Sequence, residues 1–311
     1  MSRTLVLLGW LGFFPLLLAA QYATEITVAQ DGSGDFVHIQ AAIDEAKSFP
    51  ERRITIHVKP GIYREKVTVH AWNNHLTLRG DDAATTVITW DDHFEKIGRG
   101  RNSTFHTYTL LVQGDDFRAE NMSIENTAGP IGQAIALAVD ADRCTFRGCQ
   151  IRGHQDALYA AGQNNRQYFL RCRIEGTTDF IFGAATALFD SCEIRSKSNS
   201  YITAASTPKG KRFGFVFRHC RLTADAGVDA VYLGRPWRDF ARTVFLRCHL
   251  GAHIRPEGWQ NWPDTQRDQT AYFAEYQNMG PGAGTARRVP WSRQLSKKQA
   301  RRIKVWPESP R

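Results

Sequence analysis

The chain has 311 residues, 42% hydrophobic and 23% charged, which is an ordinary balance for a globular protein with a sizeable core. The formal net charge is +9, but residues 285–311 alone carry nine Lys and Arg against one acid, Glu308. The body is therefore nearly neutral, which argues against a general polyanion-binding protein. We expect the basic C-terminal tail to be solvated or to form a short surface helix. Attachment to an anionic polysaccharide or envelope surface is the alternative.

An apolar run opens the chain. Arg3 precedes LVLLGWLGFFPLLLAA (Leu5 to Ala20), which contains Pro15 and ends in small residues. A membrane span needs roughly 20 apolar residues, so this run is typical of an export signal, although a retained anchor is the alternative. We predict a signal peptide over residues 1–20, cleaved near 20–23. The product would be secreted, extracellular or periplasmic, without stable membrane insertion and without a nucleic-acid partner.

A short amphipathic helix is predicted next. In DGSGDFVHIQAAIDEAKSF a glycine-rich turn precedes Ile39, Ala42, Ile43 and Ala46, which recur at helical spacing. No Lys-Ser or Lys-Thr follows DGSG, so a phosphate-binding loop is rejected. The segments RITIHV, KVTV, LTLRG and TVITW then read as strands. A single helix ahead of many strands is suited to cap the open end of a coil.

A repeat occupies the middle of the chain. Phe-x-x-Cys-x-(Ile/Leu) occurs five times, beginning at Phe146, Phe169, Phe189, Phe217 and Phe245. Within each copy the Cys and the Ile or Leu lie two positions apart, which is strand alternation. The spacing predicts an all-β, single-domain parallel solenoid over residues 24–311, in which like residues stack from coil to coil. An antiparallel sandwich would show shorter spacings with hairpin turns.

The cysteines follow from the repeat. Five of the six lie at one repeat position, where an interior ladder favours a small hydrophobe. An exported protein is able to oxidise some of them, and the sequence leaves open whether any pair forms a disulfide. There is no C-x-x-C and no His spacing suited to a metal, so we expect neither a metal nor a cofactor.

The same register places two carboxylates on successive coils. Asp156 and Asp179 each lie ten positions after the Phe of their copy, and counting back from the next Phe aligns Gln133 with Asp156. Two adjacent carboxylates do not ionise independently, so one keeps a proton and the pair supplies an acid and a base or nucleophile. Gln133 and Gln155 would offer amide donors to an oxyanion. The alternative is a structural ladder of acids at a solenoid corner.

The stretch TTDFIFG contains the second acid. Strand alternation groups Asp179 with Ile181 and Phe180 with Phe182. We expect Phe180 and Phe182 to be buried, leaving Asp179 to point into a groove.

Seven stretches together resemble the pectin methylesterase (pectinesterase) family, carbohydrate esterases with a right-handed parallel β-helix fold. They run in order from Asp31 to Trp291 and cover nearly the whole mature chain: DGSGDF, GQAIAL, GHQDALY, GTTDFIFG, LGRPW, PEGW and EYQNMGPGAGTARRVPW. The resemblance implies hydrolysis of galacturonate methyl esters in pectin. We expect the protein to act as a monomer. No G-x-S-x-G is present, in keeping with a route that uses no serine triad.

The resemblance also implies roles for individual residues. Asp179 would be the nucleophile that forms an acyl-enzyme, and Asp156 the acid that protonates methanol and then activates water. Gln133 and Gln155 would stabilise the oxyanion, and Arg235 would orient Asp179. Trp237 and Trp259 match aromatic residues of the sugar-binding groove.

The chain departs from the family pattern at two positions. Ala157 stands where Thr is usual, and Ala184 where Asn is usual. Neither change removes a proposed catalytic group. Two other functions stay open at this stage: a galacturonan hydrolase or lyase on the same fold, and a non-catalytic polysaccharide-binding solenoid.

Overall fold

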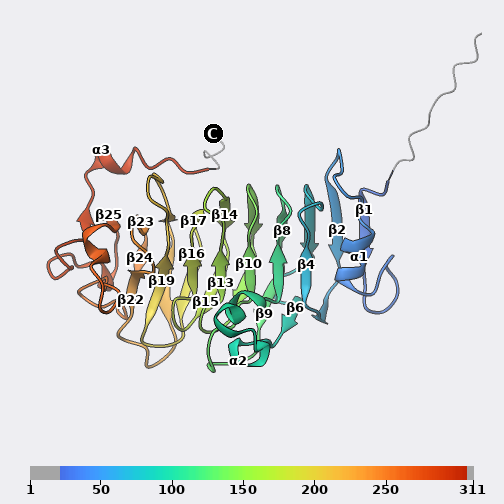
Figure 1. Cartoon of the computed structure of the whole chain (residues 1–311), viewed down its shortest axis with the longest axis horizontal. Coiled ribbons are helices and arrows are strands. Elements are labelled where there is room, and N and C mark those ends of the chain that lie inside the picture. Colours follow the sequence, from blue (N-terminus) through green and yellow to red (C-terminus); the bar gives the residue numbers. More distant parts are fainter. Residues whose placement is uncertain (1–21, 307–311) are drawn as a thin grey trace, which may run out of the picture.

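The computed structural model describes residues 22–306, so the predicted signal peptide lies outside the described residues. The chain winds into a coil with a horizontal axis in Figure 1, running from β1 at one end to β25 at the other. Every strand pairing is parallel, and the strands form three sheets in which neighbours are about three elements apart in sequence. This arrangement is a parallel β-helix. No helix in residues 22–306 is long and apolar enough to cross a membrane.

The strands fall into three sheets, which we call A, B and C. Sheet A contains β1 (Glu25–Val28), β2 (Ile54–Val58), β5 (Leu76–Gly80), β8 (Arg118–Glu120), β11 (Cys144–Arg147), β14 (Arg166–Leu170), β17 (Thr186–Asp190), β20 (Phe215–Arg218), β23 (Arg242–Leu246), β25 (Tyr272–Tyr276) and β26 (Arg293–Gln294). Sheet B contains β3 (Gly61–Arg64), β6 (Thr86–Trp90), β9 (Ser123–Asn126), β12 (Gln150–Arg152), β15 (Arg173–Gly176), β18 (Glu193–Ser196), β21 (Arg221–Ala224) and β24 (His249–Leu250). Sheet C contains β4 (Val67–Val69), β7 (Leu110–Val112), β10 (Leu137–Val139), β13 (Leu158–Ala160), β16 (Ile181–Gly183), β19 (Tyr201–Ala205) and β22 (Tyr232–Pro236).

Helices are few and short. They are α1 (Ile39–Glu45), α2 (Phe94–Ile97) and α3 (Lys297–Ala300), with 3₁₀ turns η1 (Gly100–His106), η2 (Arg267–Gln269) and η3 (Pro281–Ala283). Helix α1 lies at the β1 end of the coil (Figure 1), and Ile39, Ala42 and Ile43 are buried there against the core. The predicted capping helix is confirmed.

Each copy of the repeat turns a corner between two sheets. The Phe lies in a strand of sheet A, and the Ile or Leu lies in the following strand of sheet B. The residue before each Cys has a left-handed backbone, with φ between 52° and 62°: Gly148, Arg171, Ser191, His219 and Arg247. The prediction that each copy is one strand is therefore wrong, because a tight turn separates its two halves. The predicted stacking is confirmed.

The stacked residues form the core. The rings of Phe146, Phe169, Phe189, Phe217 and Phe245 lie 4.3–4.9 Å apart in a nearly parallel stack. All six cysteines are buried and free. The Sγ of Cys172, for example, donates to the carbonyl of Phe146 on the preceding coil at 3.4 Å. Cysteine thus adds a weak donor to its role as a small apolar residue, which the sequence did not reveal.

The C-terminal tail is a covering segment over sheet A. Beyond β25 the chain turns back across the coil and carries α3 along its upper edge (Figure 1). Its apolar residues Leu295, Ile303 and Val305 pack on the outward side chains of sheet A, such as Val244 and Tyr276. A short surface helix was predicted and is present. The expectation of a solvated tail is wrong for its apolar residues, because Leu295, Ala300, Ile303 and Val305 pack into the cluster on sheet A.

Candidate active site

A cleft of about 460 Å³ opens on the outer face of sheet C, and most of the predicted site residues line it. Asp156 and Asp179 each precede a strand, β13 and β16, and these strands pair with Leu158 opposite Ile181. The two acids therefore occupy the same position on adjacent coils, one strand spacing of about 4.8 Å apart. The register argument that paired them is confirmed.

Both acids have a left-handed backbone, with φ of 63° at Asp156 and 50° at Asp179. Asp and Asn tolerate this region better than most residues do. The Asp156 N–H donates to Thr178 O at 3.1 Å, and the Asp179 N–H donates to Tyr201 O at 2.8 Å. The corner backbone is thus bound to the next coil, which fixes both carboxyl groups.

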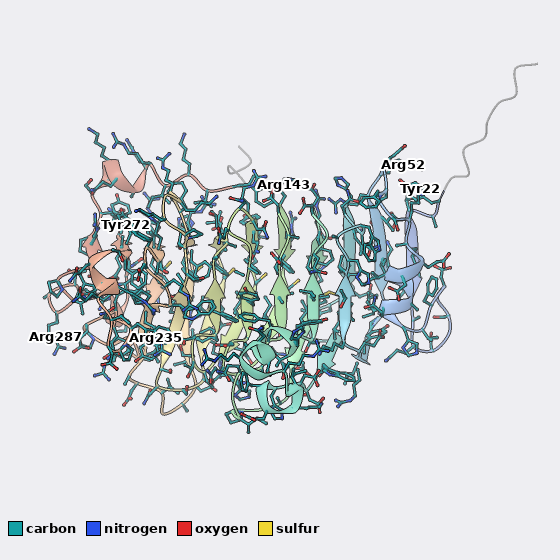
Figure 2. The ribbon with its side chains drawn as sticks, in the orientation of Figure 1. Tyr22, Arg52, Arg143, Arg235, Tyr272 and Arg287 are labelled. Atoms are coloured by element: carbon teal, nitrogen blue, oxygen red, sulfur yellow. The ribbon has the colours of Figure 1, made fainter. Side chains whose placement is uncertain are left out.

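Arg235 from β22 holds Asp179 through two hydrogen bonds. Its Nε donates to Oδ1 at 3.0 Å, and its Nη2 donates to Oδ2 at 2.6 Å. The guanidinium lies between the rings of Tyr201 and Trp262, with its carbon 4.0 and 4.1 Å from their centroids. Two aromatic faces and a bidentate carboxylate therefore fix the plane of this cation. In Figure 2, Arg235 lies on the lower side of the coil, where α2 projects.

Burial controls the protonation of the two acids. Burial, and then the nearby Asp179 charge, raise the pKa of Asp156 well above its usual range, with Arg235 opposing. Burial also raises the pKa of Asp179, but there the Arg235 hydrogen bonds and charge oppose it directly. Among residues 22–306, Asp179 has an ion-pair partner and Asp156 has none, so we expect the shared proton to reside on Asp156. The site therefore contains one neutral acid and one carboxylate.

The two glutamines lie at the same corner. Gln133 forms an isolated parallel bridge with Gln155 and not, as predicted, with Asp156. The count failed because the turn between β13 and β14 (161–165) is longer than the turn between β10 and β11 (140–143). Both side chains still line the cleft. The segment around Gln133 is held by a hydrogen bond from the Phe94 N–H of α2 to its carbonyl, at 2.9 Å.

Aromatic side chains form the floor of the cleft. Tyr159, Phe182 and Ala204 face outward from three neighbouring strands in the same row as Arg235. The Phe182 ring stacks on Tyr159 at 4.7 Å and meets Trp237 edge-on at 5.7 Å. Phe180, but not Phe182, is in the core. Both side chains are buried, as expected, but Phe182 lies in the outer cluster on sheet C. The two do not share a face, because Phe180 lies at the corner before β16 and both Phe180 and Ile181 are in the core.

Trp259 is not in the cleft. Its side chain is fully buried between Phe245 and Phe273, and its Nε1 donates to Glu275 at 3.3 Å. Its prediction as a groove residue is therefore wrong. Trp262, three positions later, lines the cleft in its place. The sequence GWQNW offered both tryptophans, and nothing in the local pattern separates them.

One wall of the cleft was not predicted from the sequence. The segment between β6 and β7 carries α2 and η1, and η1 contributes Arg101, Asn102, Thr104 and Phe105 to the cleft. Phe105 packs on Tyr159 with ring centroids 5.2 Å apart. The residue after Trp237, Arg238, stacks on the indole at 4.6 Å and adds another cation at the rim. No repeat or charge pattern marks the η1 segment as part of the site.

A sequence model of the pectinesterase family matches residues 25–307. The chain belongs to the pectinesterase family. Its relatives include Pectinesterase 31 of Arabidopsis thaliana, 41% identical over 88% of this chain and 89% of that protein. It also resembles Pectinesterase 2 of the same plant, 37% identical over 89% of this chain but only 48% of that longer protein. The chain spans about half the length of several such relatives.

Solved structures agree with the family assignment. The pectin methylesterase from carrot superposes with a TM-score of 0.82, at 33% identity over 89% of each chain. The Aspergillus niger enzyme gives 0.79 at 32% identity, covering 89% of this chain and 92% of that one. A mutant pectin methylesterase in complex with a hexasaccharide gives 0.80 at 25% identity, over 94% and 99%. The activity of this pectinesterase is hydrolysis of pectin methyl esters, and the competing hydrolase, lyase and non-catalytic functions are set aside.

Within residues 22–306, no group of three or more His, Cys, Asp or Glu is arranged to hold a metal ion. Cations in the pectinesterase cleft come only from arginines, and its acids are the two aspartates.

Proposed function

We propose that this pectinesterase works through an acyl-enzyme on Asp179. The observation that carries the proposal is the pair of aspartates on adjacent coils, only one of which has a guanidinium partner. The ionised Asp179 attacks the carbonyl carbon of a galacturonate methyl ester, and the carbonyl π electrons move onto oxygen. Arg235 offsets the cost of burying the carboxylate and aims it at the cleft.

Asp156 supplies and then removes the proton. When the tetrahedral intermediate collapses, its C–O bond to methoxide breaks and Asp156 transfers its proton to the departing oxygen, giving methanol. Asp156 is then a carboxylate, which takes a proton from water as the water attacks the sugar carbonyl of the mixed anhydride. Collapse of the second intermediate breaks the C–O bond to Asp179, freeing it as a carboxylate and leaving galacturonic acid, which loses its remaining proton to solvent. The raised pKa of Asp156 fits both roles.

Gln133 and Gln155 stabilise the oxyanion. Both are neutral amides at the corner that contains the acids, and their backbones are bridged to each other. An N–H donor aimed at developing charge in a water-poor cleft contributes far more than the same donor does in bulk water. A cationic donor at this position would instead favour ionisation of Asp156, so neutral donors preserve the acid.

The substrate is a pectin chain lying along sheet C. Phe182, Trp237 and Trp262 offer flat apolar faces for sugar rings, while Arg101 and Arg238 offer charge to neighbouring carboxylates. Related pectin methylesterases have been solved with hexasaccharides, which supports an extended polymer as the ligand. Export through a cleaved signal over residues 1–20 remains part of the proposal. Detection of the protein in the medium or periplasm, starting near residues 20–23, would test it.

The test is an assay on highly methylated pectin that measures methanol, new reducing ends and unsaturated products. We expect methanol alone from the wild type, and a loss of about 10³-fold or more in the Asp179→Asn variant. Asn suits the left-handed backbone there, so the fold should persist. The matched control is Asp225→Asn, because this acid pairs with Arg195 away from the cleft. Methanol release at the wild-type rate from Asp179→Asn would contradict the mechanism.

A further inference from the structure

The C-terminal segment creates a basic face on the side of sheet A. We use "basic face" for eight exposed cations: Arg212, Arg247, Arg293, Lys297, Lys298, Arg301, Arg302 and Lys304. None of them takes part in any salt bridge found within residues 22–306. In Figure 2 nitrogen-tipped side chains project outward around α3. Their charge is thus available to a ligand.

The backbone beneath these cations is fixed. Leu295, Ile303 and Val305 pack into the apolar cluster on the outside of sheet A. Helix α3 has a capping box, in which Ser296 and Gln299 satisfy each other's backbone N–H groups. Arg212 donates to the carbonyl of Arg302 at 3.1 Å. A cation array held in one arrangement loses less conformational entropy on binding than a mobile tail does.

A cavity of about 280 Å³ lies between α3 and sheet A, within the basic face. Its polar lining consists of Arg218, His219, Arg247, Tyr276, Lys297 and Arg301. Asp190 faces two of these groups, contacting Arg218 at 2.5 Å and the His219 ring at 3.7 Å. Arg247, Lys297 and Arg301 form no salt bridge with any other residue of the described range 22–306. The cavity therefore offers unneutralised charge beside an aromatic ring, a combination suited to a sugar carboxylate.

We infer that the basic face is a second binding site, for de-esterified homogalacturonan, the polyanion that the reaction produces. The inference rests on the proposed function, because each methyl ester hydrolysed leaves one more carboxylate on the polymer. The face lies on sheet A and the catalytic cleft on sheet C, so the two sites do not compete for the same sugars. The carboxylates of the polymer and the exposed cations of the basic face are opposite in charge, so the ligand and the face are complementary.

An anionic membrane fits this face less well. A surface-bound amphipathic segment presents large apolar side chains to the lipid. Here the apolar residues of the segment point inward to sheet A, and the large exposed hydrophobic residues of the described chain all lie elsewhere, for example Phe49 and Trp72. A polysaccharide carboxylate needs only the cations.

Binding at the basic face keeps the enzyme on its own product. A polymer segment held there raises the effective concentration of neighbouring esters at the cleft without changing the chemistry. The benefit exists only on long chains that carry carboxylates. Short, fully esterified oligosaccharides should be hydrolysed at the same rate whether or not the basic face is intact.

The experiment compares two charge-matched triple variants. The test variant is Lys297→Gln, Lys298→Gln and Arg301→Gln. The control variant changes three exposed cations near the α1 end, Lys47→Gln, Arg52→Gln and Lys59→Gln. Each protein is titrated with polygalacturonate, with fully methylated homogalacturonan and with phosphatidylserine vesicles. The titrations are run from about 50 mM to about 200 mM NaCl. Methanol release from a short methylated oligosaccharide is measured in parallel.

We expect the wild type and the control variant to bind polygalacturonate with an affinity that falls as salt rises. The test variant should bind at least about tenfold more weakly, with a shallower salt dependence. Equal loss in both triple variants, no loss in the test variant, or preferential binding to vesicles would each overturn the inference. Unchanged methanol release from the oligosaccharide shows that the fold and the proposed mechanism are intact. If the wild type released no methanol from the short oligosaccharide, that result would instead count against the proposed mechanism.

Discussion

Two ladders run along this coil in the same register, and they have opposite effects. In the interior, Phe169 and Phe189 place identical rings 4.8 Å apart, which buries apolar surface without a polar cost. At the corner before sheet C, Asp156 and Asp179 place identical carboxyls one coil apart, which is unfavourable unless one is neutral or paired. The first ladder stabilises the fold. The second is tolerated only because Arg235 reaches across from β22, and it supplies the chemistry.

The two ladders can be separated by a single substitution in each, with stability and activity measured for both variants. Phe189→Ala should lower the free energy of unfolding by about 3–5 kcal/mol, because the ring is fully buried. Methanol release per folded molecule should stay within about twofold of wild type. Urea titration and a methanol assay below the unfolding transition measure the two effects. The control Phe49→Ala, 71% exposed, should change stability by less than about 0.5 kcal/mol. Lost activity in a folded Phe189→Ala protein would mean that the ladders are not independent.

Removing Arg235, the ion-pair partner of Asp179, should reduce activity, but by a smaller factor than Asp179→Asn does. Arg235→Met should lower kcat/KM about 100-fold at neutral pH, because Asp179 loses both charge-assisted hydrogen bonds. Arg235 opposes the rise in the pKa of Asp179, so without it that pKa rises further and activity should begin at higher pH. Arg235→Lys should restore part of the rate and part of the shift. Arg195→Lys, on a half-buried pair away from the cleft, is the control. If the acidic side of the pH–activity profile did not shift in Arg235→Met, Arg235 would not be what keeps Asp179 ionised.

The cost of the acid ladder should be visible in stability as a function of pH. Burial and the Asp179 charge raise the folded-state pKa of Asp156 well above its unfolded value. The stability associated with its proton is therefore present below the unfolded pKa and is lost as pH rises through the folded pKa. At pH values above the unfolded pKa of Asp156, the Asp156→Asn variant should therefore need a higher denaturant concentration to unfold than the wild type. The gap should close at low pH. A gap that is constant across pH would indicate that Asp156 does not titrate with folding.

The smallest effect should come from the aromatic clamp on Arg235. Trp262→Leu removes one ring face 4.1 Å from the guanidinium carbon, a contact that contributes about 0.5–2 kcal/mol, so kcat should fall about 2- to 30-fold. The buried Trp259 is the natural counterpart. Trp259→Leu should cost more than about 1 kcal/mol of stability and leave kcat near wild type. If Trp259→Leu lowered kcat and Trp262→Leu lowered only stability, Trp259 and not Trp262 would belong to the active site.

Counting along the repeat predicted the register correctly where the intervening chain segments had equal length, and it failed where their lengths differed. The stretches from Phe146 to Asp156 and from Phe169 to Asp179 are equal in length, so counting paired the acids correctly. Counting back to Gln133 crossed turns of unequal length, and the count failed. The η1 wall could not be predicted, because Arg101 and Phe105 reach the cleft from an insertion that breaks the repeat. The covering role of the tail depends on the outward side chains of sheet A, which no local pattern in the tail reveals.

The central claim is that the register creates an acid pair with the proton on Asp156 and the negative charge on Asp179. The most direct measurement is a titration of the aspartate carboxyl carbons by NMR, in wild type and in the Asp156→Asn and Asp179→Asn variants. We predict one resonance with a pKa well above the usual aspartate range that is absent from Asp156→Asn. In Asp179→Asn the same resonance should titrate at lower pH, because the like charge is gone. A raised resonance that survives in Asp156→Asn and disappears only in Asp179→Asn would contradict the account.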